Sequence, residues 1–304
     1  MTEETQVTPS ETASLSQVGI LLALAGCVLF SIKPILVKVA YQYGGDATSI
    51  MTLRAFSSLP LYFLMFLYLC RHKENRNRVK KYGLKAAAIG VIGYYLASFL
   101  DIAALQFITA QLERLLIFLF PTFVVLISWA LYQQRPSRTV ILSACIGYLG
   151  IGFIVVHDFN TLGKSVLLGS LLAVASALVF AFYLVWSKPL IGHLGSSLFT
   201  SIGMGSAGLT IMVHLALSGS TISDWSRELI TTGVLLGIFC TVLPSYLVAA
   251  AMARLTPTTL SLTSNVGPAI TAGIAVVVLD ETFTIWHALG LILVVTSVYT
   301  LNRK

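Results

Sequence analysis

Long apolar runs separated by short polar stretches dominate the pattern of this sequence. Ten of these runs are about 20 residues long, the length that an α-helix needs to cross a ~30 Å hydrocarbon layer at 1.5 Å per residue. They lack the polar face that a helix of a soluble protein carries. The pattern therefore predicts ten transmembrane helices, at residues 18–40, 48–70, 84–106, 109–132, 138–157, 168–189, 197–218, 229–252, 256–279 and 284–301.

Composition supports the membrane interpretation. Of the 304 residues, 57% are hydrophobic and 10% are charged, whereas about 25% of the residues of a soluble domain are charged. The mean hydropathy is +0.88. We therefore expect an all-α integral membrane protein that crosses the bilayer many times, and not a soluble protein with a large core.

The basic residues predict how the chain is oriented. Seven of the nineteen Lys and Arg residues lie between Arg71 and Lys85, in a stretch that separates two apolar runs. Under the positive-inside rule this stretch is a cytoplasmic loop. With both termini cytoplasmic, thirteen basic residues fall inside and three, Lys38, Lys164 and Arg227, fall outside. Orientation thus accounts for the positive charge, and we expect no nucleic-acid partner.

The N-terminus, cysteines and histidines add no predicted site. Residues 1–17 are polar and acidic with no basic region before the first apolar run, which predicts a disordered cytoplasmic tail and not a signal peptide. The four cysteines are scattered without a metal-binding spacing. The histidines lie alone or near the ends of apolar runs, where we interpret them as interfacial. The sequence therefore predicts no metal, no cofactor and no catalytic residue.

The chain contains an internal repeat. At an offset of 150 residues, segment 19–30 aligns with 169–180, and at an offset of 147 residues Gly90 aligns with Gly237. Five spans per copy is an odd number, so the second copy must enter the membrane from the opposite face. Inverted-topology repeats are typical of secondary transporters, with the substrate site near the repeat interface at mid-membrane. We therefore expect ten helices in two inverted five-helix repeats, residues 18–157 and 168–302.

Several residues resemble a known family. Arg54 stands early in span two, Pro121 and Pro268 are expected to break spans four and nine, and Glu281 follows span nine. With the two repeats, these residues resemble the EamA-type exporters of the drug/metabolite transporter superfamily. The resemblance implies a bacterial inner-membrane secondary transporter that exports a small metabolite, such as an amino acid or a related compound. The sequence departs from the family at Gln134, the counterpart of Glu281, where relatives often carry glutamate.

Five ionisable residues lie inside the predicted spans, all in the first repeat: Lys33, Arg54, Asp101, Glu113 and Arg114. At 1.5 Å per residue, each lies about 6–12 Å below the outer edge of its helix, so the five form one charged layer. A charge at the centre of the bilayer costs about 2.5–3.5 kcal/mol and needs a partner, water or a substrate. Three are cations and two are anions, so we expect the spare cation to receive a carboxylate or phosphate group.

The charged layer has a second interpretation, a closed network of salt bridges that locks the helices together. In such a network Arg114 could pair with Asp101, and Arg54 with Glu113. Lys33 also has two interpretations, because a lysine near a helix end can extend to the interface. The proline that follows it favours a local break and an inward polar face instead.

Aromatic and amide residues are weaker candidates for the site. Tyr95, Tyr183 and Trp186 could line an amphipathic pocket, although such residues more often face lipid or the interface. Asn265, shortly before the proline of span nine, could line a cavity or pair with another helix.

Together these observations predict a carrier whose two repeats rock about a central site. The sequence holds no nucleotide-binding motif, so transport would run on gradients or exchange, with Glu113 or Asp101 as the candidate for proton coupling. Two alternatives are a membrane-embedded enzyme, for which no nucleophile–base pair is readable, and a non-transporting receptor. The expected partners are a small-molecule substrate and the lipid bilayer. The sequence leaves open whether the protein forms a homodimer.

Overall fold

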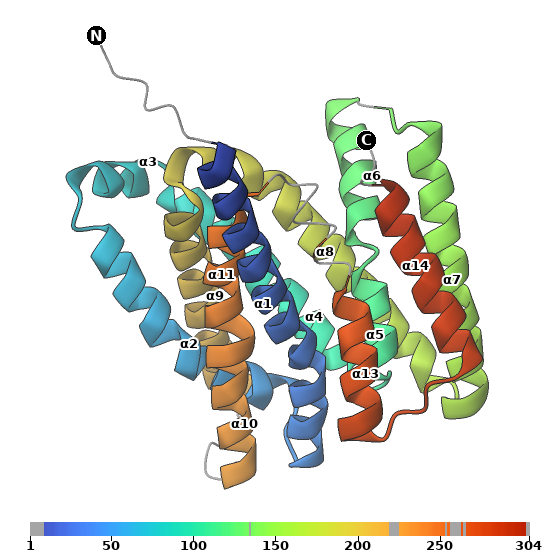
Figure 1. Ribbon diagram of the computed structural model, residues 1–304. Coiled ribbons are helices and arrows are strands. Elements are labelled where there is room, and N and C mark those ends of the chain that lie inside the picture. The colour runs from blue at the N-terminus through green and yellow to red at the C-terminus, as the bar shows by residue number, and fades with distance from the viewer. Residues whose placement is uncertain are drawn as a thin grey trace.

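The computed structural model describes residues 9–133, 135–218, 225–252, 254–255, 263 and 266–301. Their regular structure is entirely helical (Figure 1). The first half consists of α1 (Pro9–Gln42), α2 (Ala47–Leu69), α3 (Lys73–Gly90), η1 (Val91–Leu96), α4 (Ala97–Ala104), α5 (Ala110–Ile117), α6 (Phe120–Tyr132) and α7 (Arg138–Leu162). The second half consists of α8 (Ser165–Leu194), α9 (Ser196–Ser218), α10 (Arg227–Gly237), η3 (Ile238–Val242), α11 (Leu243–Met252), α13 (Gly267–Leu279) and α14 (Ile285–Leu301).

The helices follow the predicted apolar runs. In the described part of the chain, eight helical segments are long and apolar enough to cross a membrane, and they overlap the first eight predicted spans. Two shorter apolar helices, Gly267–Leu279 and Ile285–Ser297, fall in the last two. Residues 256–262, where predicted span nine begins, lie outside the described residues. The structure therefore agrees with an all-α protein that passes the membrane many times.

Helix α1 begins earlier than the sequence predicts. It starts at Pro9, within the stretch predicted to be a tail, and residues 1–8 lie outside the described part. Proline suits the first turn of a helix, where its missing N–H would have no intrahelical partner. The extra turns make α1 longer than the bilayer core requires.

Span four is interrupted at its proline. Helix α5 ends at Ile117, and α6 begins at Phe120 with Pro121 in its first turn. Proline cannot donate a backbone hydrogen bond and is tolerated in the first turn of a helix better than in its interior. Helix α13 likewise has Pro268 in its first turn.

The two halves share their irregular backbone. A π-helical turn follows α3 at Val91–Leu96, and another follows α10 at Ile238–Val242, 147 residues later. Helices α6 and α13 also begin and end 147 residues apart. Each is followed by a residue in the left-handed conformation, Gln133 (φ 56°) and Asp280 (φ 53°). The repeat therefore extends from residue identity to backbone conformation.

The helices pack in a pattern that relates the two halves. Helix α1 packs against α11 and α13, and its counterpart α8 packs against α4 and α6. Helix α2 packs against its own counterpart α9, and α7 packs against α14. Reciprocal contacts of this kind are what a two-fold relation between similar units produces. In Figure 1, α1 runs from top to bottom and α8 runs from bottom to top.

Two equivalent glycines allow helices to approach closely. A Cβ added to Gly90, just before η1, would overlap the backbone of Gly203 on α9. A Cβ added to Gly237, just before η3, would overlap Ser57 Oγ on α2. Only a residue without a side chain permits these two contacts, which join the halves at symmetric places.

We expect Gly90→Ala to lower the melting temperature in detergent, because overpacking a tight interface costs about 1–3 kcal/mol. Gly205→Ala on α9 is the matched control, since an added Cβ there meets nothing within 4 Å. It should be neutral or stabilising, because alanine favours a helix interior over glycine by about 0.5–1 kcal/mol. An unchanged or raised melting temperature for Gly90→Ala would contradict the close approach.

Candidate functional site

Asp101 lies at the centre of the charged layer. It is 5% exposed on α4, and its Oδ2 accepts a 2.5 Å hydrogen bond from Lys33 Nζ on α1. The carboxyl group of Glu113 on α5, itself 3% exposed, is an electrostatic neighbour of the Asp101 carboxyl. Arg54 on α2 and Arg114 on α5 interact electrostatically with the same carboxylate. The five residues that the sequence assigns to one layer therefore lie together in the structure.

The ion pair differs from the pairs suggested for a closed network. Among the described residues, Lys33 and not Arg114 makes the ion pair with Asp101, and no ion pair joins Arg54 to Glu113. The Lys33 side chain, 19% exposed, turns inward and does not extend to the interface. Helix α1 packs against α10, α11 and α13 of the second half as well as α5 of the first. It is therefore surrounded by other helices, and Lys33 points into the bundle.

Arg54 is buried without a direct partner in the described part of the chain. Arg54 is 7% exposed, and its side chain makes no hydrogen bond or ion pair there. Asp101, Tyr62 and Cys240 are its electrostatic neighbours. Arg54, Ser58 and Tyr62 are all buried at a spacing of four residues, which is one face of a helix. That spacing is the signal that could have revealed Tyr62 from the sequence.

Arg114 reaches from the first half to the second. Its guanidinium carbon lies 5.5 Å from the centroid of the Phe118 ring. A Cβ added to Gly267 would lie 3.3 Å from Arg114 Nη2, which places the guanidinium beside the start of α13. Its Nε is buried with no hydrogen-bond partner among the described residues. The Arg114 side chain therefore reaches from the first half to the second, and its Nε–H is free to donate a hydrogen bond to a further group.

The charged layer leaves several buried polar atoms unpaired among the described residues. Asp101 Oδ1, Glu113 Oε2 and Arg114 Nε are all buried and lack a hydrogen-bond partner within the described residues. In folded proteins roughly 90% or more of buried polar groups have a partner. A salt-bridge lock would be expected to satisfy its own atoms, because unpaired charges are costly in a dry interior. The spare atoms therefore favour a layer that receives another group.

Asp101 and Glu113 bring two buried carboxyl groups into one layer. Two buried carboxylates close together are unfavourable when both are charged. Lys33 pairs with Asp101, so Glu113 is the carboxyl group of the layer without an ion-pair partner among the described residues.

The aromatic candidates lie in different surroundings. Tyr95 in η1 makes a 3.0 Å hydrogen bond between its hydroxyl and His214 Nδ1 on α9. Tyr183 is 5% exposed and donates a 2.8 Å hydrogen bond to the Tyr94 hydroxyl. Among the described residues it makes no hydrogen bond to a member of the charged layer. Trp186 is 41% exposed. Trp186 is the most exposed of the three candidates, and its ring centroid lies 5.2 Å from that of Phe182.

Glu281 has a role that the sequence did not reveal. Its Oε1 accepts a 2.7 Å hydrogen bond from Ala110 N–H, and its Oε2 accepts a 3.3 Å hydrogen bond from Gln111 N–H. A carboxylate at a helix N-terminus satisfies free N–H groups and is stabilised by the helix dipole. Since α5 carries Glu113 and Arg114, a residue of the second half holds the helix that bears part of the charged layer.

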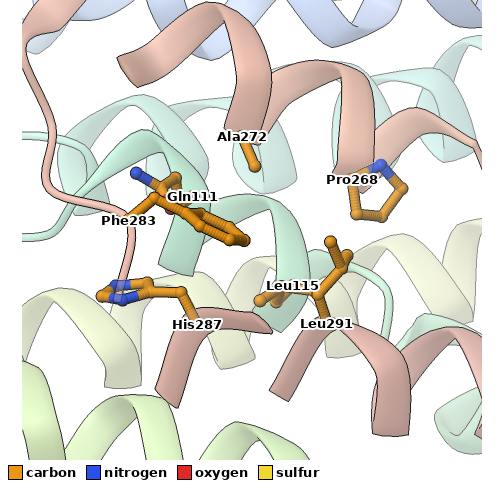
Figure 2. Close-up of a pocket in the computed structure, with 7 residues that line it drawn as sticks. All are labelled: Gln111, Leu115, Pro268, Ala272, Phe283, His287 and Leu291. Carbon is orange, nitrogen blue, oxygen red and sulfur yellow. The ribbon is translucent and has the colours of Figure 1, made fainter. Parts of the chain in front are cut away.

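Two cavities lie near the start of α5. The larger, about 280 Å³, is lined in part by Lys38, Gln42, Gln106, Thr109 and Glu281. The smaller is about 10 Å³, enough for one water, and Figure 2 shows it between α5, α13 and α14. Neither of these two cavities is lined by the charged layer. The candidates Gln134 and Asn265 lie outside the described residues.

Comparison with known proteins identifies the family. The model of the EamA-like transporter family matches residues 17–156 and, a second time, residues 167–303. The chain belongs to this family. The two matches coincide with the two halves described above, each of which contains a π-helical turn and a helix with proline in its first turn.

The EamA-like chain also has relatives along nearly its whole length. The uncharacterized transporter YcbK of Bacillus subtilis (strain 168) is 26% identical over 280 residues, covering 90% of this chain and 88% of that protein. The uncharacterized transporter sll1319 of Synechocystis sp. is 22% identical over 313 residues, covering 96% and 95%. One solved crystal structure has a similar fold, with a TM-score of 0.61 at 17% identity over 94% of this chain and 95% of that chain. Family and relatives together make this protein a membrane transporter.

We expect Lys33→Met to destabilise the protein more than the double variant Lys33→Met/Asp101→Asn. Removing one partner of a buried ion pair costs about 3–5 kcal/mol, because the other charge is left without compensation. The double variant removes both charges. Thermal unfolding in detergent of the wild type, both single variants and the double variant measures the coupling.

The control for this cycle is Arg78→Met, which breaks the solvent-exposed pair between Arg78 and Glu74. An exposed pair contributes about 0–1 kcal/mol, so its loss should hardly change the melting temperature. If Lys33→Met lowers the melting temperature as little as Arg78→Met does, the ion pair between Lys33 and Asp101 does not stabilise the contact of α1 with α4.

Proposed function

We propose that this EamA-like transporter exports a small zwitterionic metabolite, such as an amino acid or a related compound, across the bacterial inner membrane. The observation that carries the proposal is the open charged layer, in which Arg54, Glu113 and Arg114 have no ion-pair partner among the described residues. Guanidinium groups bind carboxylates in bidentate fashion. A carboxylate in turn binds an ammonium group. The three side chains therefore match the two charges of a zwitterion.

The same layer supplies a means of coupling to protons. In this proposal Glu113 carries a proton while the site is empty of substrate, because a second charged carboxylate buried beside Asp101 is unfavourable. An ammonium group that binds the Glu113 carboxylate displaces that proton, so substrate and proton compete for one group. Such competition produces exchange of substrate against protons, which drives export when the proton gradient points inward.

Alternating access follows from the arrangement of the two halves. Helices α1 and α8 run in opposite directions in Figure 1, as inverted repeats would. The described chain begins and ends at the top of Figure 1, where the stretch from Arg71 to Lys85 also begins. The positive-inside rule assigns this end to the cytoplasm. The 280 Å³ cavity beside Lys38 and Glu281 then lies at the outer end, on the exit path.

A ligand screen by thermal stability tests the substrate class. We expect an amino acid or related zwitterion to raise the melting temperature of the purified protein, because a ligand at 100 times its Kd adds about 2.7 kcal/mol. The shift should vanish in Arg114→Ala and persist in Arg138→Ala, which removes an exposed arginine at the start of α7. Shifts with organic acids or sugars alone, or shifts that survive in Arg114→Ala, contradict the proposed site.

Flux measurements in proteoliposomes test the coupling. We expect Glu113→Gln to abolish substrate movement driven by a pH gradient while substrate exchange at equal pH continues, since glutamine cannot release a proton. The control is Glu228→Gln, because Glu228 is exposed in the first turn of α10. Equal pH-driven flux in wild type and Glu113→Gln would remove the coupling role. Ligand binding without any flux in the wild type would instead indicate a receptor.

A further inference from the structure

Two histidines and an aspartate meet where α7 packs against α14. His157 and Asp158 are consecutive residues near the end of α7, and His287 lies in the first turn of α14. His157 Nδ1 lies 3.2 Å from Asp158 Oδ1, and His287 Nε2 lies 3.3 Å from the same oxygen. Asp158 and His287 are 2% and 3% exposed, so the interfacial role predicted for His287 is wrong.

The Asp158 carboxylate has no lysine or arginine partner among the residues that the structure describes. In the described part of the chain its ion-pair contacts are with the two histidines, and its other oxygen accepts a 3.4 Å hydrogen bond from Thr109 Oγ1. A buried carboxylate needs compensation by a positive charge or a metal ion. Neutral imidazoles provide no charge, but each offers a nitrogen lone pair to a metal.

The geometry of this group is close to that of a tetrahedral metal site. With metal–nitrogen bonds of about 2.0–2.1 Å, ligand atoms of a tetrahedral zinc site lie about 3.3–3.4 Å apart. The two separations from Asp158 Oδ1 are 3.2 and 3.3 Å, and all three ligand atoms lie within 4.8 Å of one another. Hydrogen-bond geometry is not met between His287 Nε2 and Asp158, which leaves that nitrogen without a hydrogen-bond partner among the described residues.

We propose that His157, Asp158 and His287 bind one divalent transition metal ion of the zinc type, with water in the fourth position. Two imidazoles and one carboxylate favour Zn²⁺, Co²⁺ and Ni²⁺ over Mg²⁺ and Ca²⁺, which prefer oxygen ligands. The site is separate from the charged layer and does not depend on the proposed substrate. The sequence does not reveal it, because one ligand comes from a span far from the other two.

A second set of contacts orients the metal-binding groups. Thr284 Oγ1 lies 2.9 Å from His287 Nδ1, which turns Nε2 of that ring toward Asp158. Thr109, which contacts Asp158, also accepts the Leu112 N–H at the start of α5. Supporting hydrogen bonds of this kind are typical of histidine and carboxylate ligands. A bound ion would therefore join α7 to α14 and, through Thr109, to α5.

Cobalt titration of the full chain tests the proposal. The protein is purified without a histidine tag, treated with a chelator and titrated with Co²⁺ under visible absorption. We expect one Co²⁺ per chain with the spectrum of tetrahedral coordination, displaced by Zn²⁺ but not by Mg²⁺. Thr284→Ala should weaken binding about 10–100-fold, and His157→Ala, Asp158→Asn and His287→Ala should weaken it further.

The matched control is His193→Ala, because His193 is exposed and stacks on Tyr82 away from the cluster. It should bind Co²⁺ as the wild type does. Should a variant of a buried ligand fail to fold, His157→Ala still decides, since its side chain is the most exposed of the three. Absence of stoichiometric binding in the wild type, or binding unchanged in folded His157→Ala, overturns the proposal.

Discussion

A charge inside an apolar helix bundle needs a partner of opposite charge. In this protein the ion pair between Lys33 and Asp101 meets that need. The pair joins α1 to α4 and leaves Glu113 beside an already neutralised carboxylate. Because Lys33 is used in this way, Arg54 and Arg114 stay without ion-pair partners among the described residues. The open character of the charged layer, and with it the proposed substrate site, therefore depends on which cation Asp101 takes.

The two halves are alike in backbone and unlike in chemistry. The π-turns, the proline-started helices and the left-handed residues recur at one offset. The charged residues do not, and Tyr183 stands where the first half has Lys33. The two halves therefore share their backbone irregularities, whereas the five residues of the charged layer all belong to the first half.

Much of the fold could be predicted from the sequence, because apolar runs of bilayer length and a repeat at a fixed offset are local signals. The set of charged residues was also predictable from their depth along each helix. Their pairing was not, since Lys33 and Arg114 both reach Asp101 and helix rotation decides between them. The meeting of Asp158 with His287 depends on tertiary packing that no spacing along the chain records.

Glu281, a residue of the second repeat, supports a helix of the first repeat. Its carboxylate, from the connection after α13, receives the first N–H groups of α5. The start of α5 is therefore capped in part by Thr109 of its own repeat and in part by Glu281 of the second repeat. The repeats are consequently not interchangeable modules. A chimaera that takes its second half from a relative would inherit a functional α5 only with a carboxylate at this position.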